Sequence, residues 1–176
     1  LGMDRSFGVA GWPFGLWLGL VLAAGLSCAP TEAPAMADLF TLTDRLVDAR
    51  PLTQEKVEVI TGVRREPTSR GKNPFYRFLE SRSGRGFLDR VELREPRTGA
   101  DRRGGILILD IDARAAGHKH GELVDRYGRD FDFEPPAGGP PNAPAYYLYH
   151  RPWGDLRFGW DRSHGGIMVV VIDAER

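Results

Sequence analysis

Two histidines in one short stretch are the first residues of this chain that could do chemistry. His118 and His120 lie two residues apart, and Asp112 precedes them by a few positions. Imidazole nitrogens and a carboxylate are ligands that zinc accepts, and zinc-bound water can hydrolyse a substrate. Lys119 between the histidines would repel a cation, and the stretch 113–123 has the composition of a linker. We interpret it as a solvated linker; the alternative is a metal-dependent hydrolytic enzyme that uses His118, His120 and Asp112.

The other acidic side chains indicate structure rather than catalysis. Asp110, Asp112 and Asp173 follow apolar segments, at the points where strands are expected to leave the core. The sequence contains no Gly-x-Ser-x-Gly, no phosphate-binding glycine loop and no His-Glu-x-x-His pair. We therefore expect a protein that is not an enzyme, with no catalytic residue, no metal and no cofactor.

An aromatic segment near the C-terminus is the strongest functional indication in the sequence. Six aromatic residues lie between 146 and 160, with arginines among them. In a strand, Tyr147 and Tyr149 share one face and Tyr146 points to the other. If one of these faces is exposed, it presents residue types enriched at protein interfaces; cross-strand packing within the sheet is the other interpretation. The residues that we expect to bind a partner are Tyr147, Tyr149, Trp153, Arg157 and Trp160.

The charge balance argues against nucleic acid as the partner. The chain of 176 residues has 24 Lys and Arg residues and 24 Asp and Glu residues. A chain without net positive charge has no general attraction for phosphate backbones or anionic lipids. Its hydrophobic content of 41% and charged content of 27% are typical of one globular domain. We therefore expect a protein partner and no nucleic acid.

The N-terminal segment is typical of an export signal. Residues 7–29 carry no charge, and their densest apolar part, 14–26, is shorter than the ~20 residues that cross a bilayer. We expect residues 1–37 to be a signal peptide or lipoprotein leader. The protein would then be exported to a bacterial periplasm, either free or tethered to a membrane as a lipoprotein.

Three fates of this leader are compatible with the sequence. Cys28 follows Gly25-Leu26-Ser27 and resembles the lipobox of bacterial lipoproteins, in which the cysteine is lipidated. Ala35-Met36-Ala37 is an Ala-x-Ala cleavage site ahead of Asp38 and would release a soluble product. An uncleaved anchor is the third, because the uncharged run extends over 23 residues.

Beyond the leader, helix and strand patterns alternate twice. Helices are expected at 40–47, with Asp38 as cap, from Thr53 to Gly62, and at 121–128. Strands are expected at 75–79, 87–94, 104–110, 145–149, 153–160 and 165–174, with a proline-rich loop at 134–144.

The two halves repeat one pattern. GGILILDIDA at 104–113 matches GGIMVVVIDA at 165–174 in nearly every residue class, and the helix-ending glycines Gly62 and Gly128 lie 66 residues apart. The recurrence predicts an internal duplication, with a first α+β repeat at 38–114 and a second at 115–176 in one compact domain. We expect two tandem units, each a helix plus three strands, that form an antiparallel sheet with the helices on one face.

This pattern resembles the BamE and β-lactamase-inhibitor-protein superfamily. The matching residues are Val57–Gly62 with Phe75-Tyr76 in the first half and Leu123–Gly128 with Tyr146-Tyr147 in the second. BamE-like members are small envelope lipoproteins, and the inhibitor members carry two tandem units that grip an enzyme across a concave sheet. The resemblance covers most of residues 50–174 and implies a non-catalytic protein-binding module of inhibitor, immunity or envelope-assembly type, whose partner is another envelope or secreted protein.

Overall fold

The fold is that of a computed structural model, which describes residues 38–68, 73–99, 104–136, 143–161 and 165–174. Residues 1–37, the predicted leader with Cys28 and the Ala35–Ala37 motif, lie outside these residues. Within them, no helix has both the length and the apolar character needed to cross a membrane.

Four helices and eight strands make up the described part of the chain. The helices are α1 (Leu39–Asp48), α2 (Gln54–Thr61), α3 (Ala113–Ala116) and α4 (His120–Tyr127). The strands are β1 (Glu66–Pro67), β2 (Tyr76–Arg85), β3 (Leu88–Pro96), β4 (Ile106–Ile111), β5 (Asp132–Glu134), β6 (Ala145–Arg151), β7 (Gly154–Asp161) and β8 (Gly166–Asp173).

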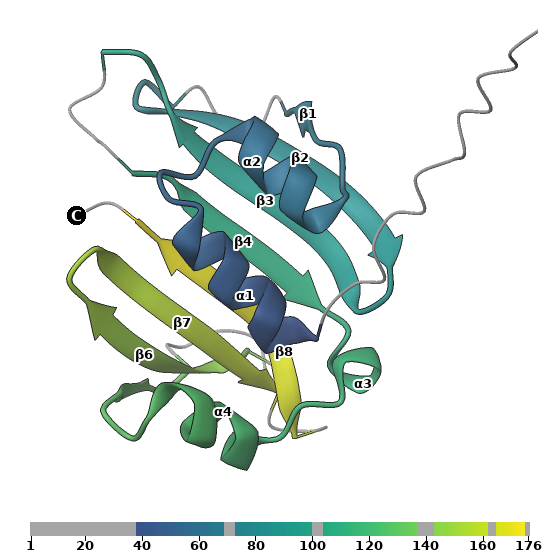
Figure 1. Cartoon of the computed structure of the whole chain (residues 1–176), viewed down its shortest axis with the longest axis vertical. Helices are drawn as coiled ribbons and strands as arrows, with labels where there is room; N and C mark the ends of the chain where they lie inside the picture. Colours follow the sequence, from purple (N-terminus) through teal and green to yellow (C-terminus); the bar gives the residue numbers. More distant parts are fainter. Residues whose placement is uncertain (1–37, 69–72, 100–103, 137–142, 162–164, 175–176) are drawn as a thin grey trace, which may run out of the picture. The chain divides into compact units, whose positions relative to one another are not determined.

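All eight strands join one antiparallel sheet in the order β1-β2-β3-β4-β8-β7-β6-β5 (Figure 1). The strands of the first half lie on one side of the β4–β8 pair, and those of the second half lie on the other. Both edges are short: β1 has two residues and ends in a proline, and β5 has three residues followed by Pro135-Pro136. Short edges with proline offer little backbone for pairing with another chain.

The mixed α+β class and the antiparallel sheet are confirmed, although the fold contains more strand than helix. The prediction of three strands per half is wrong, because β1 and β5 are too short to show an alternating pattern. The order helix, helix and four strands occurs twice, over 39–111 and 113–173. This order does not by itself establish a duplication.

Local capping explains where the predicted helices begin and end. The Asp38 carboxylate accepts hydrogen bonds from the backbone N–H groups of Phe40 (3.0 Å) and Thr41 (3.1 Å), which starts α1. Gly62 ends α2 in the left-handed conformation, at φ 66°. The expected linker 113–123 is instead partly helical, because Asp112 caps α3 and α4 already begins at His120.

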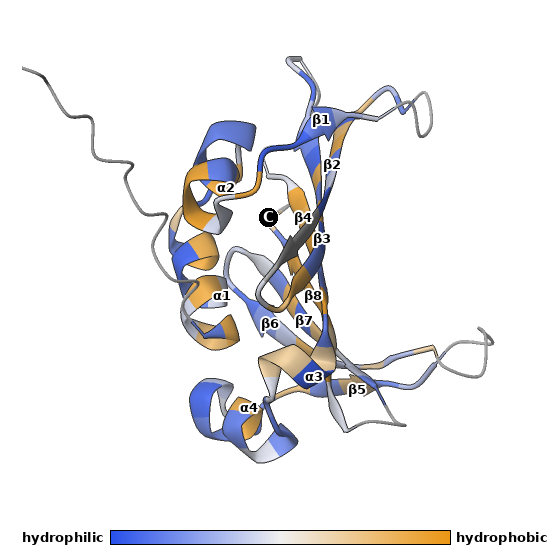
Figure 2. Ribbon diagram, turned by 90° about the vertical axis from the view of Figure 1, so that its right-hand side faces the viewer, coloured by the Kyte–Doolittle hydropathy of each residue, from blue (hydrophilic) through white to orange (hydrophobic). Residues whose placement is uncertain are grey.

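One face of the sheet packs against helices to form the core. Figure 2 shows the sheet nearly edge-on, with α1, α2 and α4 on the same side. A row of directly opposed side chains crosses six strands on this face, and each is at most 2% exposed. The row consists of Leu79, Leu93, Leu107, Ile172, Leu156 and Tyr149.

The other face, here called the open face, has no described helix over its middle (Figure 2). The residues next to the core row point to it, since side chains alternate along a strand. Its central row runs from Glu92 through Ile108, Val171 and Arg157 to Leu148. Ile108 and Val171 are only half-buried, whereas Leu107 beside them is fully buried.

Two neighbouring substitutions in β4 test this difference between the faces. Leu107→Ala should lower the free energy of unfolding by about 2–5 kcal/mol, because it empties a fully packed site. Ile108→Ala should lower the free energy of unfolding by clearly less, because the Ile108 side chain is only partly removed from water. Denaturant unfolding of both variants measures the two losses; equal losses would mean that both faces are packed.

Candidate functional site

The five aromatic and arginine candidates do not lie together on an exposed surface. Tyr149 is fully buried in the core, and its hydroxyl donates to the carbonyl of Gly128 at 3.1 Å. Tyr147, Trp153 and Trp160 are half-buried and pack against the same core. Only Arg157 belongs to the open face. The predicted alternation is confirmed, but the Tyr147 and Tyr149 side of β6 is the one that faces the helices.

The aromatic segment instead packs α1 and α4 onto the second half of the sheet. Phe158 lies 4.9 Å from the ring of Tyr127 on α4 and 6.3 Å from Phe40 on α1, between ring centroids. The hydroxyl of Tyr127 donates to Asp44 of α1 at 2.9 Å. Cross-strand and helix–sheet packing therefore accounts for these rings, and a role in binding a partner stays a prediction for them.

The histidines and Asp112 have separate structural roles. His118 stacks on Phe40 and bonds Glu122 at 2.9 Å through Nδ1. His120 packs against Tyr147, with 4.8 Å between ring centroids, while Asp112 caps α3. In the described ranges, no three His, Cys, Asp or Glu side chains are grouped as metal ligands. The structure thus does not bring His118, His120 and Asp112 together as ligands of one metal ion.

The open face carries an apolar strip between two charged clusters. The strip consists of Ile106, Ile108, Val169 and Val171 on the central strands β4 and β8. In the first cluster, on β2, β3 and β4, Arg90 donates to Asp110 at 2.6 Å and to Glu92 at 3.2 Å.

Hydrogen bonds balance most of the charge in this first cluster. Glu92 is only 6% exposed and also accepts from Arg94 at 2.9 Å, so two guanidinium groups hold its carboxylate. Arg90 reaches Glu80 as well, at 3.4 Å. The hydrogen bond to Asp110 is the main reason that the pKa of Arg90 is raised above its ordinary value.

The second cluster, on β5 to β8, centres on one arginine. Arg157 donates to Asp155 at 3.2 Å and lies 3.7 Å from Asp173 and 3.9 Å from Glu134. One oxygen of Asp173 is buried and has no hydrogen-bond partner among the described residues. Three carboxylates therefore share one guanidinium, and the acidic charge is only partly compensated.

A glycine lets an aromatic ring extend the apolar strip over β7. A Cβ at Gly159 would lie 2.2 Å from a methyl of Val169 and 2.9 Å from the ring of Tyr146. Only glycine leaves room for this close approach. Burial, assisted by the charges of Asp110 and Glu134, raises the pKa of Tyr146. Tyr146 is a functional candidate that sequence reasoning missed, although the alternation along β6 already placed its side chain on the other face of the sheet from Tyr147.

His150 joins two aspartates at the β5 edge of this face. Its Nδ1 lies 2.8 Å from Asp155 and its Nε2 lies 3.1 Å from Asp132. These hydrogen bonds, first to Asp155 and then to Asp132, raise the pKa of His150 above its ordinary value. Protonated histidine donates from both ring nitrogens, so its charged form ties β5 to β6 and β7.

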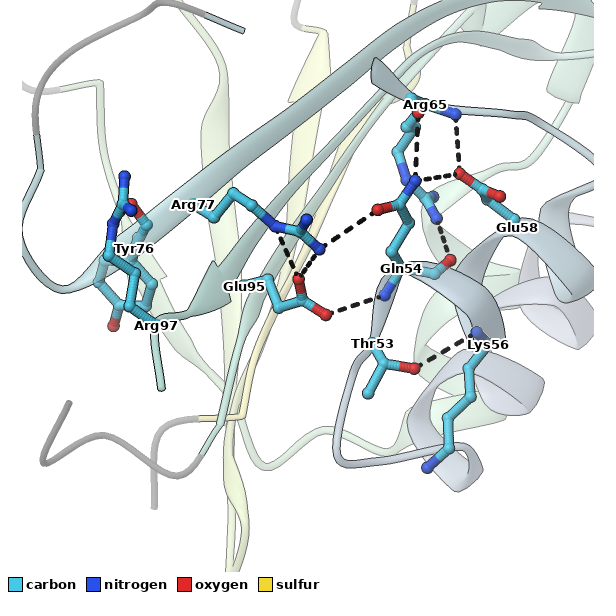
Figure 3. Close-up of polar contacts among 9 residues, drawn as sticks. All are labelled: Thr53, Gln54, Lys56, Glu58, Arg65, Tyr76, Arg77, Glu95 and Arg97. Carbon is cyan, nitrogen blue, oxygen red and sulfur yellow. Dashed lines mark hydrogen bonds and ion pairs between the residues drawn. The ribbon is translucent and has the colours of Figure 1, made fainter. Parts of the chain in front are cut away.

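A hollow of about 770 Å³ lies at the start of α2 and is a separate candidate. Pro51, Arg77, Glu95 and Arg97 are among its lining residues. In Figure 3, Glu95 accepts hydrogen bonds from Arg77 at 3.1 Å and from the backbone N–H of Gln54 at 3.2 Å. The helix N-terminus and Arg77 thus already have an anionic partner within the chain.

The buried Arg65 beside this hollow supports α2. It is 1% exposed and donates from Nη2 to the carbonyl of Gln54 at 2.6 Å, the first residue of the helix (Figure 3). Its backbone N–H bonds Glu58 at 3.0 Å. Burial lowers the pKa of Arg65 to about 10, which leaves it charged at neutral pH. These contacts hold α2 against the sheet.

Comparison of the chain with known proteins found no matching family model, no matching curated protein and no matching solved structure. The resemblance to the BamE and β-lactamase-inhibitor-protein superfamily therefore stays a prediction, and function must be argued from the open face.

The His150 contacts predict a pH-dependent contribution to stability. Because its pKa is higher in the folded state, the contribution is present in full below the ordinary pKa of 6.5 and is lost as the pH rises through the raised value. The difference in unfolding free energy between the native chain and His150→Gln should therefore shrink on going from acidic to alkaline pH. Denaturant unfolding at a series of pH values measures it; a constant difference would contradict the bridge.

The packing at Gly159 predicts a large effect of one methyl group. Gly159→Ala should lower the free energy of unfolding by about 1–3 kcal/mol, because the new Cβ overlaps Val169. Gly121→Ala on α4 is the matched control, since its Cβ meets no atom within 4 Å. A neutral Gly159→Ala would mean that Tyr146 and Val169 do not pack closely over β7.

Proposed function

We propose that the protein is an exported, non-catalytic protein-binding module and that it binds its partner through the open face of the sheet. The observation that carries the proposal is the apolar strip in the middle of a sheet face that no described helix covers; Ile106, Ile108 and Val171 of this strip are half-buried. An uncovered apolar patch bordered by charged residues is the usual composition of a protein interface.

The residue assignment follows the faces of the sheet. Arg157 keeps its predicted binding role, and the half-buried Ile108, Val171 and Tyr146 join it as contact residues. Tyr149 is assigned to the core, because a fully buried ring is not available to a partner. Tyr147, Trp153 and Trp160 support the module from the helix-covered side.

The tandem arrangement belongs to the same proposal. The matching segments GGILILDIDA and GGIMVVVIDA contain β4 and β8, which pair with each other at the centre of the sheet. The strand order is symmetric about this pair, and each half begins with two helices. We infer an internal duplication from this agreement, with the second unit starting at α3 rather than at residue 115.

The location is proposed from the leader. Lipidation at Cys28 would tether the module in the cell envelope, whereas cleavage after Ala37 would release it. In both cases the partner is another envelope or secreted protein. Inhibition, immunity and envelope assembly are the roles compatible with such a binder.

Site-specific crosslinking tests the binding face. A photoreactive residue at Ile108 or Val171 should capture the same protein in the native host, and one at Val59 should not. Val59 is the matched control because it is apolar and 73% exposed on α2.

Substitution then tests binding with the purified partner. Val171→Arg should raise the dissociation constant at least tenfold, because it places a long charged side chain in the apolar strip. Val59→Arg should leave it unchanged. If the two variants lose affinity equally, or if Val171→Arg binds as tightly as the native chain, the open face is not the binding surface.

A further inference from the structure

Among the described residues, the second half of the open face carries more acidic than basic side chains. We name Asp132, Glu134, Asp155 and Asp173 the acidic patch. Glu134, Asp155 and Asp173 lie around Arg157, and Asp132 lies at the β5 edge beside His150. The charged form of His150 adds one cation at this edge. In the described part of this face, four carboxylates therefore lie near one permanently charged side chain.

The distances between carboxylates and arginines are on the whole longer in this patch than in the first cluster. Around Arg90 and Arg94, three carboxylates accept hydrogen bonds of 2.6–3.4 Å. Among the described residues, Arg157 donates a hydrogen bond to Asp155, while Asp173 and Glu134 lie at 3.7 and 3.9 Å from it. Asp173 leaves one buried oxygen without a partner among the described residues. The carboxylates of the acidic patch are therefore held less closely by cations than those of the first cluster.

The outer carboxylates of the patch are accessible. The Asp132 side chain is 73% exposed and that of Glu134 is 45% exposed. Both come from β5, so they stand at the rim, while the half-buried Tyr146 and Val171 lie further inside. An apolar centre with an acidic rim complements a surface that has apolar residues ringed by lysine or arginine.

We propose that the acidic patch selects a basic partner, whose lysine or arginine side chains pair with Asp132, Glu134 and Asp173 while its apolar residues cover Tyr146 and Val171. This inference rests on the proposed function and specifies the chemistry of the partner. A second copy of the chain does not fit, because two acidic patches brought face to face repel each other.

The probe is a synthetic peptide that alternates lysine and leucine, titrated into the full-length, isotope-labelled chain and followed by NMR. Shifts should map to β5–β8, and the same peptide with glutamate in place of lysine should not bind. Binding of the lysine peptide should weaken steeply with added salt, since exposed charge pairs are screened. Shifts confined to the helices, no binding, or equal binding of the glutamate peptide would overturn the proposal.

Two charge-matched double variants separate local from overall charge. The double variant Asp132→Asn, Glu134→Gln should raise the dissociation constant of the lysine peptide about tenfold. Glu55→Gln with Asp125→Asn changes the net charge equally on the exposed surfaces of α2 and α4 and should leave it within about twofold. Equal weakening by both would show non-specific attraction and overturn the patch as the site.

Folding of the patch variant is checked by thermal unfolding. If it is destabilised, Glu134→Gln alone replaces it, paired with Glu55→Gln, because the ion pair that Glu134 makes within the described residues is a long one, 3.9 Å from Arg157. With the partner captured at Ile108 and Val171, the same two variants decide between the proposals. A partner that binds the patch variant as tightly as the native chain refutes the basic-partner inference and leaves the open-face function intact.

Discussion

The antiparallel pairing of β4 with β8 is the interaction on which the rest of the structure depends. Five residue pairs, from Ile106 opposite Asp173 to Asp110 opposite Val169, join strands that lie far apart in the sequence. Each half alone would end its sheet in a long apolar edge strand, with a row of unpaired backbone groups. The pairing removes both edges at once and leaves the ends of the sheet to β1 and β5, which are short and proline-bounded. It also aligns Leu107 with Ile172, so that one continuous core row can be covered by the helices.

The two faces of the sheet differ in the residues that they carry. The helix-covered face uses the large aromatic side chains, since rings such as Tyr149 and Phe158 fill the space between the sheet and helices α1 and α4. The open face keeps smaller apolar residues in the middle and charged residues toward the sides. Under the proposed function, the apolar residues in the middle of this face would be buried against the partner, and the uneven charge of the two clusters would select it.

Sequence reasoning located most of the secondary structure for reasons that the structure bears out locally. Asp38 caps α1, Thr53 caps α2 and Gly62 ends it, because these effects depend only on neighbouring backbone groups. The strands at 87–94, 104–110, 145–149, 153–160 and 165–174 were found within two residues of their bounds, whereas the strand predicted at 75–79 continues to Arg85. The short elements β1, α3 and β5 were not, because their two to four residues carry no periodic signal. The candidate site was only partly accessible: Arg157 and the face opposite Tyr147 could be read from alternation, but not which face the helices would cover.

By itself, the sequence determined the local elements, the alternation of the two faces along each strand and the absence of excess positive charge. It also determined the match between the segments that became β4 and β8. Only the tertiary structure decided that these two segments pair with each other and that the helices cover the face of Tyr147 and Tyr149. It also decided that Glu134, Asp155 and Asp173 gather around Arg157, and that Asp132 lies beside His150. The physical reason is the separation along the sequence of the groups that interact. Caps and periodicity depend on residues a few positions apart, whereas burial and charge compensation depend on strands brought together from distant parts of the chain.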